Sequence, residues 1–131
     1  MIDFTQFVPP SSPNWYLVAP VGMTTQASAT APSYQMGRNQ LQSEIVSIIQ
    51  ATPRTRLKYH DAGAHQYHFV VLSKWFRFPD DIYLQTFQLD SDHVTFLLYS
   101  KSRYGYYDFG VNKARVTNWL MALEHHINIT D

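Results

Sequence analysis

The spacing of apolar residues predicts one amphipathic helix in the first half of the chain and another at its end. Between residues 38 and 51, four aliphatic residues share one helical face: Leu41, Ile45, Ile48 and Ile49. Between residues 112 and 127, five apolar residues do the same: Val116, Trp119, Leu120, Leu123 and Ile127. We expect Asn39, with Gln42, to cap the first helix and Asn112 to cap the second, since an Asn side chain can accept from unpaired backbone N–H groups.

Between the two helices the apolar period changes to two, which indicates strands. Four segments are rich in aromatic and β-branched residues or alternate with polar ones: 55–59, 66–78, 82–89 and 93–100. Pro79 and the pair Asp80 and Asp81 break the second segment from the third, and an Asp-Ser-Asp turn joins the last two. Four antiparallel strands in a meander follow from this pattern.

Residues 1–35 hold five of the seven prolines and a polar stretch of small residues, so regular structure should be sparse there. The same segment carries too many aromatic and aliphatic residues for a disordered tail, among them Phe4, Phe7 and Trp15. We expect an irregular N-terminal arm packed on a single domain of residues 36–131. The fold class is then α+β, with a four-stranded antiparallel sheet, two helices on one face, and the arm along an edge or across the other face.

Composition narrows the possible functions. The chain of 131 residues can bury one core, and its ten Lys and Arg balance ten Asp and Glu, so no overall field favours nucleic acid or an anionic bilayer. The absence of cysteine excludes disulfides, thiolate chemistry and Cys-ligated zinc. No apolar stretch is long enough to span a membrane, and the start lacks a signal-peptide pattern. We expect a cytoplasmic protein, or a periplasmic or envelope protein if a leader was removed.

The densest run of unusual residues is the junction between the last strand and the last helix, residues 99–115. Gly105 and Gly110 suit strained turns, and Arg103 and Asp108 are close enough in sequence to pair across the turn. Asp108 could instead accept from backbone N–H groups at the helix start. One interpretation is a structural clasp, and the other is a site where Arg103, Arg115 and the helix N-terminus bind a carboxylate or phosphate.

We therefore separate two sets of candidate residues in and around this corner. The candidate ligand-binding residues are Arg103, Tyr104, Tyr106, Asp108, Asn112 and Arg115. The candidate structural residues are Ser100, Ser102, Gly105, Gly110, Asp80 and Asp81. Tyr side chains of the loop combine an apolar body with a polar tip, which suits contact with a ligand or partner.

No residue set predicts a catalytic or metal site. Asp80 and Asp81 are neighbours and would point to opposite faces of a strand, so they cannot act on one bond together. The six histidines form no recognisable ligand set, and no Ser lies in a nucleophile pattern. We expect no metal and no cofactor.

The stretch from Ser100 to Arg115 resembles the signature of a bacterial and plastid family known as domain of unknown function 1499. That signature is Ser-x-Ser-Arg-x-Gly-x-x-Asp-x-Gly-x-Asn-x-x-Arg, and this chain fills each place with the following residues: Ser100, Ser102, Arg103, Gly105, Asp108, Gly110, Asn112 and Arg115. Pro13-Asn14 is similar to an early Pro-Asn of the family, and residues 76–81 are similar to its Phe-x-Asp-Asp element. The resemblance covers nearly the whole chain.

This chain departs from the family where many relatives have a Cys shortly after the Pro-Asn, since it has Trp15 and Tyr16 there. The resemblance implies no activity. We expect a non-catalytic binding module for a small ligand or a protein partner at the 99–115 corner. Two alternatives stay open: a hydrolase-like enzyme using Asp108 or Asp81 with a nearby Tyr or His, and a structural dimerisation module.

Overall fold

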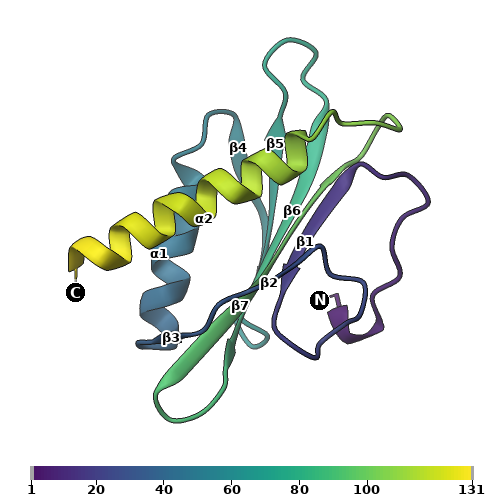
Figure 1. Cartoon of the computed structure of the whole chain (residues 1–131). Coiled ribbons are helices and arrows are strands. Elements are labelled where there is room, and N and C mark those ends of the chain that lie inside the picture. The colour runs from purple at the N-terminus through teal and green to yellow at the C-terminus, as the bar shows by residue number, and fades with distance from the viewer. Residues whose placement is uncertain (1, 131) are drawn as a thin grey trace.

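The computed structural model describes residues 2–130, with side chains through Ile127, and has the α+β architecture expected from the sequence (Figure 1). Its elements in chain order are a 3-10 helix η1 (Phe4–Gln6), β1 (Trp15–Ala19), β2 (Ala29–Thr30), β3 (Tyr34–Gln35), α1 (Arg38–Gln50), β4 (Thr55–Asp61), β5 (Gln66–Leu72), β6 (Pro79–Gln88), β7 (His93–Ser102) and α2 (Val111–Thr130). In residues 2–130 neither helix is long and apolar enough to cross a membrane.

The sheet has seven strands in the order β2-β1-β7-β6-β5-β4, with β3 also paired to β7. All pairings are antiparallel except β1 with β2. The prediction of four strands was wrong in number, because it counted only the meander β4 to β7. The missed strand β1 comes from the N-terminal segment, where the adjacent Leu17 and Val18 are both buried, one on each face. A strand buried on both faces shows no alternation of apolar and polar residues.

Three local expectations are also corrected. Helix α1 begins after Gly37, whose backbone fills the N-cap position, so Asn39 is not a cap. Residues 73–78 form a turn rather than the end of a strand, held by the Ser73 N–H donating to the Phe78 carbonyl and the Phe78 N–H donating to Ser73 Oγ. The next strand begins at Pro79 and includes both aspartates.

The sheet separates two apolar layers. On one face α1 and α2 pack side by side over Phe69, Ile82 and Phe96, and these helices cover the left side of the sheet in Figure 1. On the other face Phe4 and Phe7 of the N-terminal segment pack on Tyr99 with ring centroids 5.7 Å and 5.2 Å away. The division of the chain at residue 35 stays a prediction.

The packing of the N-terminal segment predicts a large stability effect from its first aromatic residue. Phe4 is 3% exposed and contacts the rings of Phe7, Tyr83 and Tyr99. Phe4→Ala should lower the free energy of unfolding in urea by about 3 to 5 kcal/mol, because it leaves a cavity under the arm. Val8→Ala, at a side chain 81% exposed, should change it by less than about 0.5 kcal/mol. Equal effects of the two variants would contradict this packing.

Candidate functional site

Asn112 is the centre of the strand-to-helix corner. Its side chain is fully buried in the first turn of α2. Its Nδ2 donates to the carbonyl of Asn14 at 3.1 Å, to Ser102 Oγ at 2.9 Å and to Asp108 Oδ2 at 2.7 Å. Its Oδ1 accepts from Ser100 Oγ at 2.5 Å. Asn112 is therefore a buried hydrogen-bond hub and not the N-cap that its position suggested.

Asp108 performs the capping role instead. Its carboxylate accepts from the N–H groups of Gly110 at 3.0 Å and Asn112 at 3.2 Å. Burial raises the pKa of Asp108, but these hydrogen bonds, with that from the Asn112 side chain, outweigh burial and lower its pKa overall. Gly105 and Gly110 have φ values of 84° and 77°, in the left-handed region that favours glycine.

The two adjacent aspartates of β6 bind different arginines. Asp80 Oδ2 lies 2.8 Å from Arg115 Nη2 on the helix-covered side of the sheet, where Arg115 Nη1 also donates to Ser100 and Asn112. Asp81 lies on the opposite side and accepts from Arg103 at 2.7 Å. Of the two alternatives for Asp108, the pairing with Arg103 is therefore wrong, and the bonds to N–H groups at the start of α2 are confirmed.

Asp81 has a second partner, His68, whose Nε2 lies 2.8 Å from Asp81 Oδ1. The His68 ring stacks on Tyr83 with centroids 4.4 Å apart. Burial raises the pKa of Asp81, but the hydrogen bonds and charges of Arg103 and His68 outweigh it, so the pKa lies below that of an ordinary Asp. The carboxylate is thus held ionised.

Two neighbouring loops, one of them in the strand-to-helix corner, project aromatic side chains into solvent. We call this surface the aromatic end. It comprises the β5–β6 turn and the loop from β7 into α2, which lie at the top of Figure 1. Its exposed apolar side chains are Trp75, Phe76, Phe78, Tyr104, Tyr106, Tyr107, Phe109 and Val111. The loops contact each other through the Phe78 and Tyr104 rings, 6.4 Å apart, and through the Arg103 N–H donating to the Pro79 carbonyl at 3.2 Å.

A cavity of about 310 Å³ adjoins the aromatic end and is lined by three arginines. Arg54 and Arg56 come from the start of β4, and Arg77 comes from the β5–β6 turn. Val70 and Leu72 form the apolar part of the lining. No acidic side chain among the described residues lines it.

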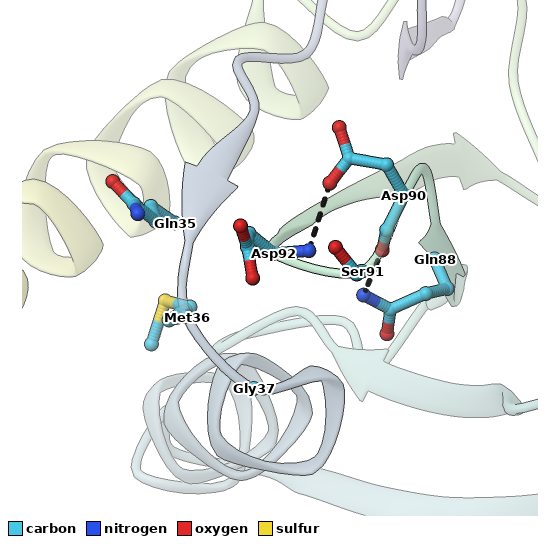
Figure 2. A pocket seen from close by; sticks show the side chains of 7 residues that line it. All are labelled: Gln35, Met36, Gly37, Gln88, Asp90, Ser91 and Asp92. Carbon is cyan, nitrogen blue, oxygen red and sulfur yellow. Dashed lines mark hydrogen bonds between the residues drawn. The ribbon is translucent and has the colours of Figure 1, made fainter.

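Two further cavities differ in chemistry. The first, of about 540 Å³, lies between the segment before α1 and the β6–β7 turn at the other end of the sheet. Figure 2 shows it between Gln35, Met36 and Gly37 on one side and the turn residues on the other, with the Asp92 N–H donating to Asp90. The second, of about 410 Å³, is mostly apolar and lies between β1, β2 and α2.

The predicted site residues fall into two groups. Six of the twelve form one connected network of side chains, the clasp, defined as Ser100, Ser102, Asp108, Asn112, Arg115 and Asp80. Tyr104 and Tyr106 are instead exposed at the aromatic end. Arg103 lies between the groups, with its guanidinium on Asp81 and two-fifths of its side chain exposed.

Sequence reasoning missed the arginine cavity and the exposure of Trp75, Phe76 and Phe78, which it placed in the predicted strand 66–78. Arg77 between two phenylalanines interrupts the apolar run just before Pro79, and this could have signalled a turn. The role of Asn14 was also missed: its Nδ2 donates to the Gly105 carbonyl at 2.6 Å.

The fold and the site together define the class of protein: an α+β protein with a mostly antiparallel sheet and an internally bonded clasp that joins the last strand to the last helix. A family model described as "Protein of unknown function (DUF1499)" matches residues 8–123, and the chain belongs to this family. The match confirms the resemblance seen in the signature residues. A comparison with curated proteins found no match.

The buried amide of the clasp yields a stability prediction. Asn112→Ala should lower the free energy of unfolding by about 2 to 4 kcal/mol, since it leaves several buried groups without partners. Asn118→Ala, at an exposed position of the same helix, should change it by less than about 0.5 kcal/mol. Urea titration followed by circular dichroism measures both. If both variants changed the free energy of unfolding by similarly small amounts, the clasp would contribute little to stability.

The lowered pKa of Asp81 predicts a pH-dependent effect. Because the folded-state pKa lies below the unfolded value of about 3.9, ionised Asp81 stabilises the fold above that value. The contribution disappears as pH falls through the folded-state pKa. Asp81→Asn should therefore reduce the free energy of unfolding at about pH 7 and much less at about pH 2. Asp92→Asn, an exposed control, should not show this difference, and an equal loss for Asp81→Asn at both pH values would refute the assignment.

Proposed function

We propose that this protein is a non-catalytic binding module whose contact surface is the aromatic end. The observation that carries the proposal is the exposure of eight large apolar side chains on two adjacent loops, with Phe109 97% exposed and Trp75 79% exposed. Monomeric soluble proteins rarely expose a contiguous apolar surface of this kind without using it for contact. The loop from β7 into α2 is anchored at its base by the clasp, and the β5–β6 turn is closed by the two hydrogen bonds between Ser73 and Phe78.

The clasp itself is a weaker candidate for ligand contact. Arg115 is occupied by Asp80, Ser100 and Asn112, and Asn112 is fully buried. A carboxylate or phosphate entering there would have to displace internal partners that already satisfy these groups. Of the six candidate ligand-binding residues, the ones we propose for direct contact are Arg103, Tyr104 and Tyr106.

A hydrolase-like enzyme is the second candidate, favoured by one observation. Asp81 and His68 are within hydrogen-bond distance, and a carboxylate beside a histidine can orient a general base. Two observations weigh against it. Asp81 also binds Arg103, and neither Asp81 nor His68 lines any of the three cavities described above.

Site-specific photocrosslinking tests the binding proposal. Benzoylphenylalanine at position 109, in cells producing the protein, should yield adducts with partner molecules after irradiation. The same residue at position 121, where Met121 is 65% exposed on α2, should yield several-fold fewer. Mass spectrometry identifies the adducts. Equal yields at the two positions would contradict a contact surface at the aromatic end, and adducts between two copies of the chain would favour the dimerisation alternative.

A further inference from the structure

The balanced net charge of the chain conceals a strong separation of charge. Three segments meet at the aromatic end: residues 54–56, 73–81 and 101–115. They contain eight of the ten Lys and Arg residues of the chain but three of its ten Asp and Glu. Those three aspartates are Asp80, Asp81 and Asp108, and each is bonded internally to an arginine or to the start of α2. The aromatic end is therefore a basic surface.

The opposite end of the sheet carries acidic residues. Asp90 and Asp92 lie in the β6–β7 turn, and Asp61 ends β4. The strands run between these two ends, so the molecule has a positive aromatic end and a negative polar end. A negatively charged surface would attract the aromatic end and repel the other, which fixes one orientation of approach.

Among the described residues, no ion pair joins an arginine of the cavity to an acidic side chain. Arg54, Arg56 and Arg77 surround a space of about 310 Å³ with no carboxylate in its lining. Guanidinium groups bind phosphate through paired hydrogen bonds as well as charge. One anionic headgroup could therefore be bound by several arginines at once.

The apolar residues beside this cavity have the composition of a membrane-interface surface. Trp, Tyr and Phe side chains concentrate where apolar bodies meet a hydrated polar layer. Lys74 Nζ lies over the Trp75 ring, 4.9 Å from its centroid, so a cation and an aromatic ring lie together at the tip of the β5–β6 turn. These side chains project from loops rather than lining a groove, and projecting loops suit a flat, deformable partner.

We infer that the aromatic end docks on the surface of an anionic phospholipid bilayer, with Trp75, Phe76 and Phe109 in the interfacial layer and a lipid phosphate in the arginine cavity. This inference rests on the proposed function, because it names the partner of the same surface. The composition alone does not predict this partner, since a net charge of zero implies no overall field toward a bilayer. The relevant quantity is the local charge at the end that carries the aromatic residues.

Vesicle binding by the full chain tests the inference. The protein should sediment with phosphatidylcholine vesicles that contain about 30% phosphatidylglycerol or phosphatidylserine, and much less with phosphatidylcholine alone. The fluorescence of Trp75 should shift to the blue on binding, and Trp75→Phe should abolish most of this shift, since Trp119 is buried and Trp15 is half-buried against Phe7 and Tyr99. Added salt should weaken binding, because it screens exposed charges.

Paired variants separate the contributions of charge and aromatic contact. Arg56→Gln with Arg77→Gln should reduce partition onto anionic vesicles roughly tenfold or more. Lys58→Gln, on the same strand as Arg56 but outside the cavity lining, should have a much smaller effect. Phe109→Ser should weaken binding severalfold, whereas Val21→Ser, at an exposed position outside the aromatic end, should not. Thermal unfolding confirms that each variant is folded.

Three results with vesicles would overturn the inference: no sedimentation with anionic vesicles, equal sedimentation with neutral ones, or equal effects of the cavity and Lys58 substitutions. Retention of a single-stranded oligonucleotide in place of vesicles would indicate a nucleic-acid surface instead and would also overturn it. The photocrosslinking experiment distinguishes failure of the lipid inference from failure of the proposed binding module. Protein adducts at position 109 without vesicle binding would leave the binding module standing and remove the lipid, whereas equal crosslinking at positions 109 and 121 would remove both.

Discussion

The buried side chain of Asn112 is the interaction on which the rest of the corner depends. Its amide joins three parts of the chain: the segment before β1 through Asn14, 98 residues away, the end of β7 through Ser100 and Ser102, and the loop before α2 through Asp108. A primary amide suits this place because it both donates and accepts. An aspartate would lose the donors and place a negative charge beside Asp108, and a leucine would leave the surrounding polar groups unpaired.

The clasp explains how the aromatic end can exist. Large apolar side chains in a flexible loop would collapse against the nearest core, because burying their surface is favourable. Here the loop is bonded at both of its ends, by Asp108 to the start of α2 and by Asn14 to Gly105, and Arg103 ties it to β6. These bonds restrain Tyr104, Tyr106 and Phe109, which stay exposed. The signature residues thus hold the loop through internal bonds, and the aromatic residues of the same loop form the exposed surface.

The sequence predicted the elements whose apolar period is regular and failed where tertiary contacts replace local signals. Helices α1 and α2 were predicted because each buries one stripe of residues, and the meander β4 to β7 was predicted because its strands are rich in aromatic and β-branched residues between turn signals. Strand β1 was missed because its neighbours in the sheet, not its own pattern, determine it. Asn112 was taken for a cap by its position, yet the buried partners that define its role lie up to 98 residues away in sequence. No local pattern encodes such a bond.

The basic character of the aromatic end could not be predicted from the sequence for a related reason. Net charge sums over the chain and contains no information on where charges meet in space, so ten cations and ten anions read as a neutral protein. Antiparallel pairing brings the start of β4, the β5–β6 turn and the end of β7 to one end of the sheet. That arrangement gathers the cations there and leaves acidic turns at the other end. Because electrostatic attraction falls off within a Debye length of about 10 Å, a partner at the aromatic end experiences the local excess of positive charge and not the neutral total.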